Sequence, residues 1–125
     1  MAAALETFHQ FVAAINAHEV DSIAALMTPD HIFVDSLGNR VQGADNMRVG
    51  WRGYFAMCPD YRVAVEKAIA AGDTVLSVGE AGGTIDGIAW RIPAAWQAVV
   101  RDGRVEEWRV FADNKPVYEI LAKRR

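Results

Sequence analysis

The first half of the chain places apolar side chains at helical spacing. The first such run predicts an amphipathic helix that ends near residues 16–18, with the apolar positions Leu5, Phe8, Phe11, Val12 and Ile15. Asp21 is placed to cap a second, short helix, which Thr28-Pro29 stops. A third run begins near Gly43 and ends at Pro59, and its apolar positions are Met47, Trp51, Tyr54, Phe55 and Cys58.

The segment "HIFVDSLGNRVQG", residues 31–43, separates the second and third predicted helices. Its apolar run Ile32-Phe33-Val34 predicts a buried strand, which stops at Asp35 and turns through residues 36–39. An Asp in front of Ser-x-Gly is typical of a turn cap, because its carboxylate can accept backbone N–H groups. The alternative is an acid at the mouth of a pocket.

The second half of the chain changes to strand periodicity. Four segments predict long strands joined by turns at Ala71-Gly72-Asp73, Asp86-Gly87 and Asp102-Gly103, and they are "YRVAVEKAIA", "TVLSVGEAGGTI", "IAWRIPAAWQAVV" and "RVEEWRVFA". Pro93 within the third segment suggests a bulge or an edge. The ending "KPVYEILAKR" could form a short closing helix.

This order of elements predicts an α+β fold, with three N-terminal helices packed on a strongly curved antiparallel sheet. A chain of 125 residues accommodates one domain, residues 1–125. A bent sheet wrapped around a long helix makes a cone with one open end. The mouth of such a cone is a natural site for a small molecule.

Composition narrows the classes of function. Thirteen basic and 16 acidic residues give a net charge of −3, without a basic stripe, so nucleic-acid binding is not expected. Cys58 is the single cysteine, which suits a reducing cytoplasm. The sequence has no apolar run of the roughly 20 residues that cross a bilayer, and its start does not read as a signal peptide. No spacing of His, Asp or Glu is typical of a metal site, and no cofactor is expected.

The segment "FVAAINAHEVDSIAALMTPDHIFVDSLGNRVQG" resembles the N-terminal half of the NTF2-like superfamily, in its SnoaL-like and ketosteroid-isomerase-like branch. The ending "VEEWRVFADNKPVYEIL" also resembles SnoaL-like C-termini. The resemblance implies a cone-shaped, cystatin-like α+β fold over nearly the whole chain. It implies no single reaction, because this fold hosts isomerases, cyclases, hydrolases, dehydratases and non-enzymatic binders.

The resemblance places Asp35 where ketosteroid isomerase has its general-base aspartate. That enzyme also has an oxyanion hole made of a Tyr and a protonated Asp. Phe11 falls at the Tyr position and Ala95 at the Asp position, so both donors are missing here. Losing one such donor typically costs on the order of a hundredfold in rate, so authentic ketosteroid isomerisation is not expected. Trp51 falls at the position of a pocket tyrosine.

Two other branches fit no better. The limonene-epoxide-hydrolase branch uses an Arg-x-Asp pair and another Asp on a neighbouring strand. This sequence has no Arg-x-Asp, and Val110 falls at the other Asp position. SnoaL-type polyketide cyclases use an Asp on a later strand, for which no equivalent is identified.

The candidate catalytic residue is therefore Asp35. Partial desolvation by apolar neighbours would raise the pKa of such a carboxylate, as a proton-abstracting base needs. The predicted substrate-binding residues are Phe11, Phe33, Met47, Trp51, Tyr54, Phe55, Gln97 and Trp108. An aromatic stripe on a helix is usually core, but in a cone the core and the pocket wall are one surface. Gln97 and Tyr54 could donate to a substrate carbonyl, or could be structural.

Strand parity also bears on which face of the sheet His31, Trp90 and Trp96 occupy. His31 shares strand parity with Asp35, although a surface position at the strand start is the simpler interpretation. Trp90 and Trp96 have the opposite parity to Gln97, which would place them on the convex sheet face. In the family that face is the usual dimer surface, so the resemblance implies a homodimer through the outer sheet face.

Three functions remain open at this stage. The first is a cytoplasmic, cofactor-independent isomerase, cyclase or lyase, in which Asp35 moves a proton next to a carbonyl of a hydrophobic substrate. The second is a non-catalytic binder of a hydrophobic small molecule. The third is a protein-interaction module, which would have its cone filled by side chains.

Overall fold

The computed structural model describes residues 3–124. The elements, in chain order, are α1 (Ala3–Asn16), α2 (Val20–Ala25), β1 (Met27–Val34), β2 (Arg40–Gln42), α3 (Ala44–Met57), β3 (Arg62–Ala71), β4 (Thr74–Ile85), β5 (Ile88–Arg101), β6 (Arg104–Ala112) and α4 (Lys115–Ala122). The predicted α+β order, with the helices ahead of the long strands, is confirmed. The closing helix is also present.

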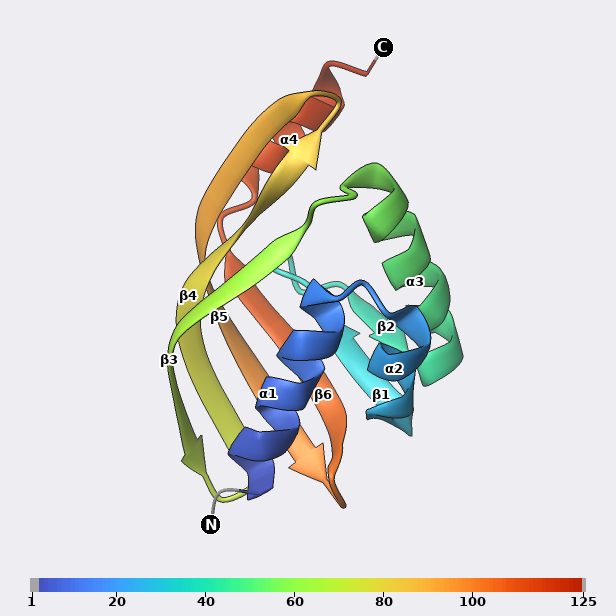
Figure 1. Cartoon of the computed structure of the whole chain (residues 1–125), viewed down its shortest axis with the longest axis vertical. Helices are drawn as coiled ribbons and strands as arrows, with labels where there is room; N and C mark the ends of the chain where they lie inside the picture. The colour runs from blue at the N-terminus through green and yellow to red at the C-terminus, as the bar shows by residue number, and fades with distance from the viewer. Residues whose placement is uncertain (1–2, 125) are drawn as a thin grey trace.

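The strands form one six-stranded sheet in the order β2-β1-β6-β5-β4-β3. Strands β3 to β6 make the antiparallel meander that the turn signals predicted, while β1 pairs with β6 in parallel. Figure 1 shows the sheet curving around α1, with α2 and α3 on the same side and α4 at the far end of the β4–β5 hairpin. The result is a cone with α4 over its wide end.

Turn chemistry explains the hairpins. Asp86 and Gly87 have φ of 52° and 76°, and Asp102 and Gly103 have φ of 52° and 73°. These left-handed values match the twist of the flanking strands and favour Asp-Gly pairs. Both hairpins therefore form where the sequence predicted them.

Pro93 makes no bulge in β5. The register between β4 and β5 runs without a break from Thr74↔Val99 to Ile85↔Ile88. Strand β6 pairs with β5 only from Ala94 onward, so Pro93 lies where β5 has an open side. A proline is tolerated there because no partner strand needs its missing N–H.

Two local expectations were wrong. Helix α2 has Glu19 at its N-cap without a side-chain cap, and Asp21 lies inside the first turn. His31 is fully buried rather than on the surface, because its strand parity with Phe33 and Asp35 turns it to the inner face, against Phe11 of α1. Its Nδ1 lies 2.8 Å from the Val105 carbonyl oxygen, and burial lowers the pKa of the imidazole. His31 is thus a neutral core residue near neutral pH.

Candidate functional site

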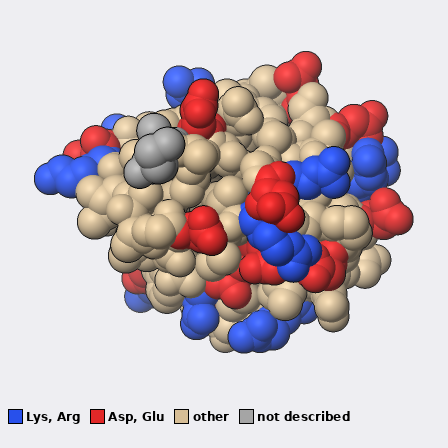
Figure 2. Space-filling view, turned by 90° about the horizontal axis from the view of Figure 1, so that it is seen from below, with Lys and Arg blue, Asp and Glu red and all other residues tan. Residues whose placement is uncertain are grey.

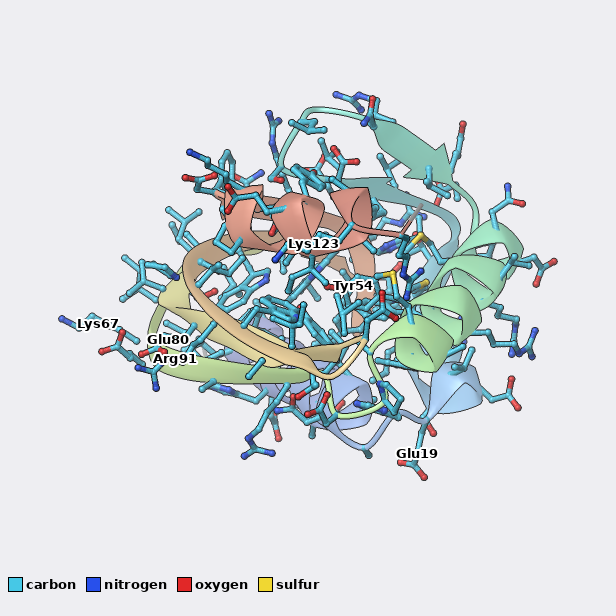
Figure 3. All side chains as sticks on the ribbon, turned by 90° about the horizontal axis from the view of Figure 1, so that it is seen from above. Glu19, Tyr54, Lys67, Glu80, Arg91 and Lys123 are labelled. Atoms are coloured by element: carbon cyan, nitrogen blue, oxygen red, sulfur yellow. The ribbon has the colours of Figure 1, made fainter. Side chains whose placement is uncertain are left out.

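A cavity of about 310 Å³ lies between α3, α4 and the concave face of the sheet. This volume is at the lower end of the range typical of small-molecule pockets. Figure 3 looks toward this end of the molecule and shows Tyr54 pointing from α3 into the space beneath α4. The cone is therefore not filled by its own side chains.

The sheet supplies the floor of the cavity. Alternation along β5 turns Trp90, Ile92, Ala94 and Trp96 to the concave side, and all four line the cavity. Trp108 on β6 lies next to Trp96, with 6.5 Å between ring centroids. All four tryptophans of the chain line the cavity. The tryptophan fluorescence of the protein will therefore report on a ligand that enters the cavity.

An aromatic wall stands where α3 meets β5, and it comprises Trp51, Tyr54, Tyr61 and Trp90. The Tyr54 and Tyr61 rings meet edge to face at 4.8 Å, and Trp51 lies 6.3 Å from each. The ring of Trp90 stacks on Tyr61 at 6.1 Å. The rings contact one another and present one continuous apolar surface.

Contacts from the end of α1 hold this wall in place. His18 Nε2 lies 2.7 Å from the Tyr61 carbonyl oxygen, and the His18 ring stacks on Phe55 at 4.0 Å. The Asn16 amide donates to the Val63 carbonyl at 2.9 Å and accepts the Val63 N–H at 2.8 Å. The chain around Tyr61 is thus tied at two points to α1.

The wall carries polar atoms within an apolar setting. The Nε1 of Trp51 is buried without a hydrogen-bond partner among the described residues. An orphaned buried donor typically costs about 1–3 kcal/mol, so such groups in native proteins call for an explanation. Burial raises the pKa of Tyr54 and of Tyr61, and the neighbouring Tyr54 raises that of Tyr61 further. Both phenols therefore stay protonated at neutral pH.

Helix α4 closes one side of the cavity and is held at both ends. Asn114, in front of the helix, donates to the Ser36 hydroxyl at 2.7 Å. Beyond its C-terminal end, Arg124 donates to both carboxylate oxygens of Asp86, at 2.5 and 2.9 Å. Tyr118 of α4 also lines the cavity and is 43% exposed. The rim near Ser36 is therefore the more polar end of the site.

Asp35 lies at this polar rim and caps the 35–39 turn. Its Oδ1 accepts the N–H groups of Leu37 and Asn39, both at 2.9 Å, and its Oδ2 accepts the Asn39 amide at 3.1 Å. Asp35 is half-buried and is also among the residues that line the cavity. The two interpretations of Asp35 are therefore compatible in space, because one carboxylate caps the turn and borders the cavity.

Six of the nine predicted site residues border the cavity, and they are Phe33, Asp35, Met47, Trp51, Tyr54 and Trp108. Phe11 projects instead from α1 onto the sheet, with its ring 4.9 Å from Trp108 and 6.3 Å from His31. Phe55 stacks between Trp51, at 5.2 Å, and His18, at 4.0 Å, and does not border the cavity. Both are core residues, because Trp108 and Trp51 stand between them and the cavity.

The placement of Gln97 was wrong. Gln97 lies on the outer sheet face, where its amide donates to Glu107 at 3.0 Å. Trp90 and Trp96, expected on that face, lie inside and are 7% and 2% exposed. The apolar alternation of β5 could have shown this, since every second residue from Trp90 to Val100 is apolar. Ala95 also faces outward, and its inward neighbours carry no carboxyl group.

The described residues add little further chemistry. Residues 3–124 contain no group of three His, Cys, Asp or Glu that could hold a metal ion. No helix within that range has the length and apolar character needed to span a membrane. Figure 2 shows basic and acidic side chains interspersed over the face seen from below. The electrostatic footprint of a nucleic-acid binder does not appear on that face.

Comparison with known proteins identifies the class. The family model for the SnoaL-like domain matches residues 8–108. One solved structure is of a Jannaschia sp. protein assigned as a SnoaL-like polyketide cyclase. Its TM-score is 0.86 at 20% identity, and the match covers 99% of this chain and 94% of that one. An LEH-like epoxide hydrolase from M. tuberculosis has a TM-score of 0.83 at 20% identity, covering 98% and 89%. No curated protein sequence matches the chain.

A third structure is a protein with a ketosteroid-isomerase-like fold from Catenulispora acidiphila, in complex with trimethylamine. Its TM-score is 0.79 at 23% identity, and the match covers 85% of this chain and 84% of that one. These identities show the shared fold and do not transfer an activity. The chain belongs to the SnoaL-like domain family, within the NTF2-like superfamily.

Proposed function

We propose that this SnoaL-like protein binds a hydrophobic, carbonyl-bearing small molecule in the cavity between α3, α4 and the sheet. The observation that carries the proposal is a cavity of about 310 Å³ lined mainly by aromatic and aliphatic side chains. Burying apolar ligand surface there is favourable by roughly 25 cal/mol per Å². The free volume argues against a cone used only as a protein-interaction module.

The experiment is a titration with fluorenone, a rigid aromatic ketone, followed by tryptophan fluorescence. We expect saturable quenching, because all four tryptophans border the cavity. We also expect the midpoint of thermal unfolding to rise with fluorenone concentration, since the ligand binds the folded state alone. Quenching that grows linearly without saturation, together with an unchanged midpoint, would count against the proposal.

A catalytic role for Asp35 is the finer proposal. Its Oδ2 accepts a single hydrogen bond, from Asn39, which leaves a lone pair for a proton taken from a bound ligand. Asp35 would then move a proton next to the ligand carbonyl in a cofactor-independent isomerase, cyclase or lyase step. The missing oxyanion donors at Phe11 and Ala95 argue against ketosteroid isomerisation itself.

Proton exchange tests Asp35 without knowledge of the natural substrate. We expect the protein to accelerate deuterium incorporation next to the carbonyl of α-tetralone in heavy water, measured by mass spectrometry. Asp35→Asn should remove this acceleration, by a factor of roughly a hundred or more, and leave much of the affinity. Asp113→Asn, which changes a carboxylate at the start of α4, is the matched control. Exchange that survives in Asp35→Asn would show that Asp35 is not the base.

The outer sheet face supports a second proposal, a homodimer. Four apolar residues on this face are 47–62% exposed, and they are Ile69, Leu76, Val78 and Phe111. Cross-strand pairing brings them together, since Ile69 pairs with Leu76, and Ala95 lies between Val78 and Phe111. Exposed apolar surface of this kind typically marks an interaction site. A second copy of the chain could cover it.

Light scattering after size exclusion measures the oligomeric state. We expect a mass of about twice 13.7 kDa for the unaltered chain. Val78→Glu should shift the mass to that of one chain, because it would bury a charge in the centre of the contact. Val49→Glu, at a 68% exposed position on α3, should have no effect. A monomeric unaltered chain at high micromolar concentration would contradict the dimer.

We also propose that the protein works in a reducing, cytoplasmic location. Its support is the single cysteine, Cys58, which is buried and cannot pair within the chain.

A further inference from the structure

The indole N–H of Trp51 is the clearest polar group without a partner in the cavity wall. Trp51 is 8% exposed and lines the cavity, and its Nε1 finds no hydrogen-bond partner among the described residues. The Nε1 of Trp90 is also buried without a partner, but its indole lies beside the Cys58 thiol. Only Trp90 has the thiol beside its indole, so the Trp51 N–H is the more clearly unpartnered donor of the two among the described residues.

Two phenols lie on the same wall. Tyr54 follows Trp51 by three positions on α3, so both side chains project from one face of the helix. Tyr61 packs against both, with ring centroids 4.8 Å from Tyr54 and 6.3 Å from Trp51. Phenol hydroxyls can donate or accept, whereas an indole N–H only donates. An acceptor atom is thus the ligand group that suits all three.

Charge on the lining limits the kind of acceptor. Asp35 is the one charged residue that borders the cavity in the described part of the chain, and it lies at the opposite, polar rim. A ligand carboxylate held by these three residues would meet no cationic residue on the cavity lining, and burying an unpaired charge is unfavourable. A neutral acceptor such as a carbonyl oxygen therefore fits this lining better than a carboxylate.

We infer that Trp51, Tyr54 and Tyr61 form an oxygen-binding corner, which selects ligands that carry a neutral carbonyl oxygen at their buried end. This inference rests on the proposed function and adds its specificity. It assigns carbonyl recognition to these three donors and not to Gln97, which lies outside. It also orients the ligand, with its carbonyl toward α3 and Tyr61 and its other end toward the rim at Ser36 and Asp35.

The test compares fluorenone with fluorene, the hydrocarbon of the same ring skeleton. Dissociation constants for both are measured for the unaltered chain and for Trp51→Phe, Tyr54→Phe and Tyr61→Phe. We expect each substitution to weaken fluorenone binding by roughly three- to tenfold relative to fluorene, as the loss of one net hydrogen bond predicts. Trp90→Phe is the matched control, because it removes an indole N–H outside the corner. It should change both affinities equally.

The carbonyl stretching band of bound fluorenone provides a second readout. Hydrogen bonds from the corner should shift it to lower wavenumber than in an apolar solvent, and the three substitutions should move it back. Equal loss of fluorene and fluorenone affinity in all variants, with an unshifted band, would overturn the corner and leave the proposed function standing. Failure of both probes to bind the unaltered chain would overturn both. A circular dichroism spectrum of each variant shows that the fold is retained.

Discussion

Gly83→Ala is expected to destabilise the protein by about 2–3 kcal/mol, a typical cost of forcing extra volume into a packed core. A Cβ at this position would overlap the Cys58 sulfur and would lie 3.1 Å from Asp60 Oδ1 and 3.2 Å from the Tyr61 Cα. Cys58 is fully buried and cannot move aside. Urea denaturation followed by circular dichroism measures the change in the free energy of unfolding.

A double-mutant cycle isolates the contact with the sulfur. Cys58→Ala removes the atom that the new methyl group would strike, so Gly83→Ala should cost at least about 1 kcal/mol less in that background. Gly53→Ala is the control, because a Cβ there meets nothing within 4 Å on α3. It should stabilise the helix by up to about 1 kcal/mol. An equal cost of Gly83→Ala in both backgrounds would mean that Cys58 does not require this glycine.

The largest effect on binding is expected from Ala94→Phe. Ala94 lies on the cavity floor, paired with Gly79 on β4 and Ala112 on β6. A phenyl ring at this position would occupy the space that a ligand needs, so fluorenone affinity should fall by roughly a hundredfold or beyond detection. The stability of the protein should be retained, because the ring fills a void. Tryptophan quenching and calorimetry measure the affinity.

The neighbouring residue provides the matched control. Ala95 is on the same strand and of the same type, but it faces outward between Val78 and Phe111. Ala95→Phe should leave the fluorenone affinity within about twofold of the unaltered chain. Equal losses in Ala94→Phe and Ala95→Phe would place the binding site outside the cavity.

Local patterns were sufficient to predict most of the fold. The three- and four-residue spacings of α1 and α3 and the Asp-Gly turns are signals that nearby residues carry by themselves. The parallel pairing of β1 with β6 was not predictable in this way. It joins residues more than 70 positions apart, such as Phe33 and Trp108, and no local pattern encodes such a partner.

The site was less predictable because it depends on parity and register. The side chains of a strand alternate between faces, so an error of one residue moves Gln97 inside and Trp96 outside. The alignment with ketosteroid isomerase made this error at Ala95, although the apolar alternation of β5 indicated the correct face. His31 was misplaced because its position at the strand start favoured the surface, although its parity with Phe33 and Asp35 indicated the inner face. Tyr61 follows α3 in a short loop, where no periodicity indicates its direction.

The central claim is that a hydrophobic small molecule occupies the cavity against the wall formed by α3 and β5. Proton–nitrogen correlation spectra resolve the indole N–H signals of the four tryptophans, each of which borders the cavity. Titration with fluorenone should shift these signals saturably, and the Trp51 signal, assigned through Trp51→Phe, should move furthest downfield as its N–H gains an acceptor. Indole signals that stay unchanged up to the solubility limit of fluorenone would contradict the account.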